Sequence, residues 1–98
     1  MIGTLNENIK FLRQKNGLNQ VEFAKIMHVT KQCVSNWEND NVVPSVEMLV
    51  KLANYFKVST DYLLGRTEDR TINVSGLTEE QIAHVSILVR DLYLANQK

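Results

Sequence analysis

The 98-residue sequence predicts an all-α fold: five short helices, a linker and a C-terminal helix. Apolar residues recur at helical spacing in successive segments, and residues that favour helix N-caps precede most of these segments. Glycine marks the end of two of them, at Gly17 and Gly65. Only two or three residues separate the second and third segments, which is the spacing of a helix-turn-helix.

The first two segments read as helices joined by a tight turn. Residues 5–15 place apolar side chains on one helix face, and Gly17 ends that helix. Asn19 is positioned to cap the second helix, with Glu22 at the third position of a capping box. We expect the apolar side of the second helix to consist of Val21, Phe23, Ala24, Ile26 and Met27.

Three further helices are predicted before the linker. Thr30 caps the third helix, from Lys31 to about Asn39, and residues 40–44 read as a loop. Ser45 caps the fourth helix, 46 to about 56, whose apolar stripe is Met48, Leu49, Leu52, Ala53 and Phe56. Ser59 caps a short fifth helix that runs through Leu64.

The C-terminal third is predicted to be a polar linker and one long helix. Thr78 and Gln81 form a capping box for a helix over about residues 79–96. We divide the chain into 1–66, a linker 67–77, and a helix 78–98 that we expect to dimerise. A 3-4-3 apolar spacing marks its seam, Ile82, Val85, Val89 and Leu92, with Leu88 and Tyr93 beside it. The alternatives are packing on the chain's own helices and docking of a different protein.

Composition narrows the class of protein. The sequence shows no apolar run behind basic residues that would predict a signal peptide, and no apolar stretch of about 20 residues that would predict a membrane span. The single cysteine, Cys33, rules out an internal disulfide and fits a reducing compartment. We therefore expect a cytoplasmic protein with no membrane association.

The charge distribution indicates which part faces an anionic partner. Eleven basic and eleven acidic residues cancel over the whole chain. Residues 1–66 carry eight basic and six acidic residues, whereas residues 67–98 carry three and five. The N-terminal part is therefore the expected side for nucleic acid.

A recognisable motif runs through the second and third helices. It consists of Asn19-Gln20, Phe23-Ala24, Val29, Val34-Ser35 and Trp37-Glu38. With the ending Val58-Ser59-Thr60-Asp61-Tyr62-Leu63-Leu64-Gly65, it resembles the phage repressor and Cro family of helix-turn-helix regulators, the xenobiotic-response-element type, over residues 5–65. The resemblance implies a transcriptional regulator that binds double-stranded DNA.

The third helix is the expected recognition element. A major groove about 12 Å wide admits one α-helix, and the preceding helix braces it. Val34 and Trp37 turn inward, while the outward side carries polar residues. Glutamine and asparagine can bond adenine, and lysine can donate to guanine. The expected base-reading residues are Lys31, Gln32 and Asn36, with Cys33 and Ser35 adding contacts; an ordinary solvated helix face is the alternative.

The resemblance also assigns supporting residues. It implies that Asn19 and Gln20 contact phosphate at the start of the second helix, although Asn19 can also serve simply as a cap. Asn39 and Asn41 match the loop that grips phosphate after the recognition helix. This loop has no Lys or Arg, a departure that predicts weaker nonspecific binding. Arg13 and Glu38 match an ion pair that holds the recognition helix, with two unrelated surface charges as the alternative.

The turn between the second and third helices departs from the family at His28, where glycine is usual. We expect His28 to adopt the left-handed conformation at a cost of about 1–2 kcal/mol. The sequence contains no pattern of metal ligands, no nucleophile–base pair and no phosphate loop. We therefore expect that the protein binds no metal or cofactor and is not an enzyme.

The sequence therefore predicts a repressor or regulator that binds a roughly palindromic operator as a homodimer. The rival interpretation is a protein-interaction module, such as an antitoxin or a regulator's partner, that binds an antagonist or a toxin.

Overall fold

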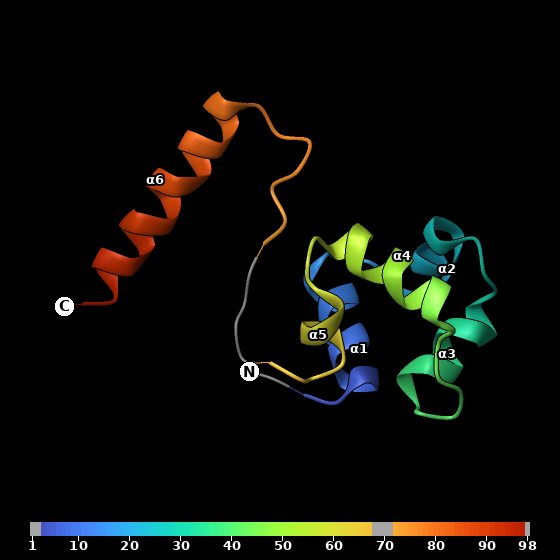
Figure 1. Cartoon of the computed structure of the whole chain (residues 1–98). Helices are drawn as coiled ribbons and strands as arrows, with labels where there is room; N and C mark the ends of the chain where they lie inside the picture. Colours follow the sequence, from blue (N-terminus) through green and yellow to red (C-terminus); the bar gives the residue numbers. More distant parts are fainter. Residues whose placement is uncertain (1–2, 68–71, 98) are drawn as a thin grey trace.

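The computed structural model describes residues 3–67 and 72–97, and all regular structure in those ranges is helical. Residues 68–71 of the predicted linker lie outside the described residues. The helices in these ranges are α1 Leu5–Lys15, α2 Gln20–Met27, α3 Lys31–Glu38, α4 Val46–Phe56, α5 Thr60–Leu63 and α6 Glu79–Ala95 (Figure 1). The predicted all-α class and helix order are confirmed.

The helix starts follow from their caps. At α2 through α6 the predicted cap accepts a hydrogen bond from the third helical residue's N–H, at 2.8 to 3.1 Å. Helix α1 begins after Thr4, a cap that was not among the predicted ones. There the backbone N–H of Thr4 donates to Glu7 Oε1 at 3.0 Å. This backbone hydrogen bond from Thr4 lowers the pKa of the Glu7 carboxyl below its ordinary value.

One core joins α1 through α5. Each of these helices supplies at least one buried residue to it, and the set is Ile9, Phe23, Ala24, Met27, Val34, Trp37, Leu52, Ala53 and Leu63. The Phe23 and Phe56 rings stack with centroids 5.4 Å apart. Val21 and Ile26, expected on the apolar side of α2, are instead 45% and 38% exposed. At 100° per residue, Phe23, Ala24 and Met27 share one side of α2, and Val21 and Ile26 lie on either side of it, nearer the surface.

The left-handed conformation expected at His28 is present, with φ 59°. It ends α2 and allows the chain to turn within two residues, His28 and Val29, before the Thr30 cap of α3. Asp40 and Lys57 also have φ 59°, a conformation that was not predicted at either position. Three turns of this domain therefore rest on residues with side chains in a region that favours glycine.

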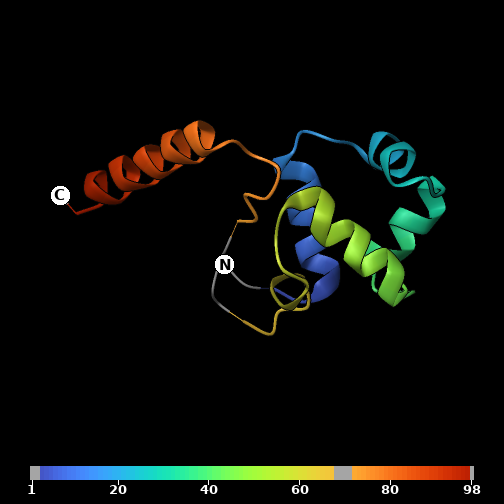
Figure 2. The same ribbon diagram turned by 45° about the horizontal axis from the view of Figure 1, so that its top comes forward.

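Helix α6 lies apart from the five-helix unit in both ribbon views (Figures 1 and 2). None of its residues is buried. The Asn73 N–H donates to the Lys57 carbonyl at 3.0 Å, so the segment before α6 touches the end of α4. None of the helices described here is long and apolar enough to cross a membrane.

Candidate nucleic-acid interface

The exposed side of α3 is a continuous polar surface. Its inward side is fixed by Val34, Trp37 and Glu38, all buried. Because a helix turns by 100° per residue, burial of these three leaves the opposite side to solvent. That side carries Lys31, Gln32, Ser35, Asn36 and Asn39, which are exposed or half-buried. We call these five residues the α3 face.

Two hydrogen bonds between side chains run along the α3 face. Gln32 Nε2 donates to Asn36 Oδ1 at 3.0 Å. Asn39 Nδ2 donates to Ser35 Oγ at 3.2 Å. Each pair joins residues four apart, which are neighbours on a helix surface. Four of the five side chains thus form two hydrogen-bonded pairs, and none of the four belongs to the core cluster.

Cys33 differs from the rest of the predicted reading set. Like Ser35 and Asn36 it is half-buried, but its side chain packs against the core cluster. A small side chain in that position is expected to behave as an apolar residue. Base contact by Cys33 stays a prediction.

A buried ion pair fixes the far end of α3. Arg13 Nε donates to Glu38 Oε2 at 2.6 Å, and Arg13 Nη2 donates to Glu38 Oε1 at 2.9 Å. Their side chains are 9% and 2% exposed. This two-pronged geometry is the strongest that an arginine and a carboxylate can form. The hydrogen bonds to Glu38 raise the pKa of the Arg13 guanidinium, so Arg13 stays charged.

Gln20 joins this pair from α2. Its Nε2 donates to Glu38 Oε1 at 3.2 Å, while Arg13 Nη1 donates to the Leu18 carbonyl at 2.7 Å. The Glu38 carboxylate therefore ties α3 to α1 and to the first turn of α2. Nothing in the sequence pattern had pointed to the contact between Gln20 and Glu38, because the two residues lie 18 positions apart. The second N–H of the Gln20 amide is still available for the phosphate contact that the sequence predicts.

The remaining predicted phosphate ligands flank α3. Asn19 accepts from the Glu22 N–H at 2.8 Å, so its side chain is a cap. Asn39 and Asn41 are exposed, and the Asn41 N–H donates to the Asn36 carbonyl at 2.9 Å. Asn19 thus lies at the start of α2, Asn39 at the end of the α3 face, and Asn41 two residues beyond it.

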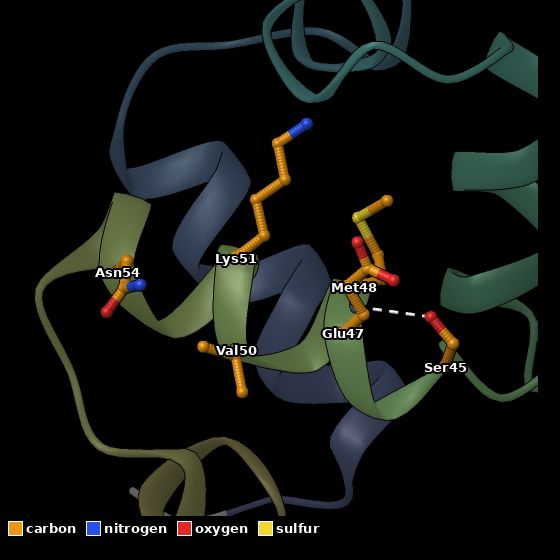
Figure 3. A pocket seen from close by; sticks show the side chains of 6 residues that line it. All are labelled: Ser45, Glu47, Met48, Val50, Lys51 and Asn54. Atoms are coloured by element: carbon orange, nitrogen blue, oxygen red, sulfur yellow. Dashed lines mark hydrogen bonds between the residues drawn. The ribbon is translucent and has the colours of Figure 1, made fainter.

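A hollow on the outer side of α4 carries no comparable chemistry (Figure 3). It is lined by Ser45, Glu47, Met48, Val50, Lys51 and Asn54. Its one ammonium, on Lys51, donates to the Met27 carbonyl at 2.7 Å and thereby caps the end of α2. Among the described residues, no group of three His, Cys, Asp or Glu is placed to hold a metal ion.

The predicted dimer seam lies on α6. Ile82 and Val85 are half-buried. The others, Leu88, Val89, Leu92 and Tyr93, are 56 to 61% exposed. The structure therefore shows an apolar helix face that the chain's own five-helix unit does not cover.

Comparison with known proteins bears on this arrangement. A helix-turn-helix family model matches residues 9–63. The HTH-type transcriptional regulator ImmR of Bacillus subtilis is 38% identical over 79 residues, covering 81% of this chain and 62% of ImmR. The antitoxin PezA of Streptococcus pneumoniae is 33% identical over 69 residues, covering 70% of this chain and 42% of PezA. The chain spans less than two thirds of the length of the curated relatives that it matches.

Solved structures share the architecture. The P22 c2 repressor in complex with a synthetic operator matches with a TM-score of 0.61 and 29% identity, over 66% of this chain and 98% of that chain. A transcriptional regulator from Listeria innocua matches with a TM-score of 0.62 and 26% identity, over 97% of both chains. The second match therefore extends beyond the five-helix unit into α6.

Proposed function

This chain belongs to the helix-turn-helix family of the phage repressor and Cro type, and from this premise we propose that it is a sequence-specific DNA-binding repressor. The proposal rests on one observation: the polar α3 face is exposed, while a buried pair, Arg13 and Glu38, holds the helix behind it. A rigidly mounted polar helix is what base readout in a major groove requires.

The α3 face supplies the groups that would read bases. Lys31, at the N-terminal end of α3, presents an ammonium that can donate to guanine, and Gln32 and Asn36 present amides suited to adenine. The P22 c2 repressor, which shares this fold, was solved on a synthetic operator. This likeness supports the view that α3 enters the groove here too.

Phosphate contacts would come from polar rather than basic groups. Gln20 offers its free amide N–H, and Asn39 and Asn41 offer theirs beyond α3. Each Lys or Arg placed on a phosphate releases condensed counterions and steepens the dependence of affinity on salt. With Lys31 as the only basic member of the α3 face, we expect a shallow salt dependence.

We propose that two copies bind a roughly palindromic operator. The exposed face of α6, from Ile82 to Tyr93, would join them. Two recognition helices would then lie about 34 Å apart, one turn of DNA. Such a protein would act in the cytoplasm, where its DNA is.

A second candidate function is a protein-interaction module. Two observations favour it: the uncovered apolar face of α6 and the similarity to the antitoxin PezA. In that case α6 would dock a toxin or an antagonist, and DNA binding would be secondary.

Binding selection from random double-stranded DNA separates the two functions. A repressor should enrich one motif with two related half-sites, whereas an interaction module should enrich none. On the enriched site, Gln32→Ala should cost about 1–3 kcal/mol, with affinity for unrelated DNA unchanged. Equal losses on both kinds of DNA would show that Gln32 does not read a base.

A further inference from the structure

The two ends of α3 are held by different parts of the domain. At its C-terminal end, the Glu38 carboxylate is fixed by Arg13 of α1. Its N-terminal end follows α2 after the turn at His28 and Val29 and the Thr30 cap. The position of that end therefore depends on what holds the C-terminal end of α2.

A contact from α4 holds the end of α2. Lys51 Nζ donates to the carbonyl of Met27, the last residue of α2, at 2.7 Å. Lys51 is half-buried, and its side chain extends from α4 toward α2 (Figure 3). The last carbonyls of a helix have no partner within it, and a positive charge is favourable at that end. Met27 also packs in the core, but apolar packing has no preferred direction, whereas a charge-assisted hydrogen bond does.

A change at this turn would be felt most by the first residues of α3. His28, at φ 59°, occupies a region that costs energy for a residue with a side chain, so the turn needs an outside restraint. The eight residues of α3 span about 12 Å. Because the C-terminal end is fixed, a tilt of α3 displaces Lys31 and Gln32 more than Asn36. A hydrogen bond to a base edge is broken by a shift of about 1 Å.

We propose that Lys51 is a positioning residue for DNA binding, an inference that rests on the proposed function. It acts from α4 through the Met27 carbonyl and thereby sets where Lys31 and Gln32 lie relative to the bases. Its ammonium is engaged with the protein, so its role is not to bind phosphate. The sequence pattern does not reveal this role, because Lys51 and Met27 lie 24 positions apart.

Native-state hydrogen exchange tests the contact without DNA. Lys51→Met keeps the apolar stem and removes the donor. It should speed exchange about tenfold at the Val29 and Cys33 amides, which donate at the turn and at the start of α3. The Asn39 amide, at the other end of α3, should exchange as in wild type. Lys51→Arg should restore slow exchange, and Lys10→Met, which removes an exposed lysine from α1, should change none of these rates.

Selection from random DNA tests the effect on binding. Gln32→Ala and Asn36→Ala first assign a base position to each end of the α3 face. Lys51→Met should then weaken binding of the selected site about tenfold and flatten the Gln32 position while sparing the Asn36 position. Its affinity for unrelated DNA and its salt dependence should match those of Lys10→Met, and Lys51→Arg should recover the wild-type motif.

The outcomes separate the inference from the function beneath it. If the wild-type chain enriches no motif, the proposed function fails, whatever the exchange rates show. Equal losses on selected and unrelated DNA, with a salt slope lower by about one, would make Lys51 a phosphate ligand and overturn the positioning role. Faster exchange that includes the Asn39 amide, or a lower melting temperature with an unchanged motif, would overturn it too, because Lys51 would then only stabilise the fold.

Discussion

The five-helix unit and α6 are both helical but differ in what they bury. Each of α1 to α5 places at least one side chain in the common core. None of the 17 residues of α6 is buried. The capping box at the start of α6 is as complete as that of α2, so local signals are satisfied in both regions. Capping and spacing therefore specify a helix, whereas only a partner surface stabilises it, because an isolated helix of this length is marginal in water.

The loss of stability on truncating one apolar side chain should differ most clearly between the two regions. Phe23 is fully buried, so Phe23→Ala removes a ring and leaves a cavity. We expect it to lower the free energy of unfolding by about 3–5 kcal/mol. Leu88→Ala, the matched truncation on α6, should cost less than about 0.5 kcal/mol in dilute solution. Urea denaturation followed by Trp37 fluorescence measures both. Comparable losses would mean that α6 packs on the five-helix unit in solution.

Removing the buried carboxylate should have the next largest effect. Glu38→Ala leaves the Arg13 guanidinium buried without its partner, at a cost of about 3 kcal/mol. Gln20→Ala removes one hydrogen bond to the same carboxylate and should cost about 1.5 kcal/mol. Equilibrium unfolding of the two variants tests this order. A Glu38→Ala protein as stable as wild type would show that the pair does not brace α3.

Charged residues placed in the seam of α6 should prevent dimerisation and leave the five-helix unit folded. Val85→Glu with Val89→Glu places carboxylates on the face that we expect to be shared by two copies. The variant should be a monomer with an intact five-helix unit. It should bind a full operator about a hundredfold more weakly, because the linked second contact is lost. Light scattering of the wild-type chain at about 50 µM is the direct check, and a monomer there would refute the seam.

Replacing His28 in the turn by glycine should give a small gain in stability. With φ 59°, its side chain adds strain that glycine would not feel. Glycine also makes the unfolded chain more flexible, which offsets part of the relief. We expect His28→Gly to stabilise the unit by about 0.5–1 kcal/mol with DNA preference unchanged. His28→Val should destabilise it by more. A lower melting temperature for His28→Gly would indicate a contact that only the imidazole makes.

The smallest expected effect is a pH dependence of stability, which the cap of α1 should cause and the cap of α6 should not. The capping carboxyl of α1, Glu7, has a lowered pKa in the folded state, whereas α6 uses Gln81, which does not titrate. The contribution of Glu7 is therefore present above its unfolded pKa and is lost as pH falls through the lower folded value. Melting temperatures of wild type and Glu7→Gln should converge between about pH 5 and 3. A constant difference would exclude this role.

Most of the fold could be predicted because its signals are local. Caps such as Asn19 and Ser45 lie three residues from the N–H groups that they accept from, and the apolar stripe of α4 repeats within one helix. The contact between Gln20 and Glu38 could not be predicted, because it depends on how α2 crosses α3. The left-handed Asp40 and Lys57 were missed for a similar reason. Asp tolerates the left-handed region better than most residues and Lys does not favour it, so the residue type alone predicts this conformation at neither position.

The two pairs on the α3 face have a consequence for how this protein can change over generations. Gln32, Asn36, Ser35 and Asn39 bond to each other outside the core, so replacing them should alter stability by about 0.5 kcal/mol or less. Under the proposed function, substitutions at these few positions would change the operator while the Arg13–Glu38 pair keeps α3 in place. The α3 face would then also be a practical target for engineered variants with chosen DNA preferences.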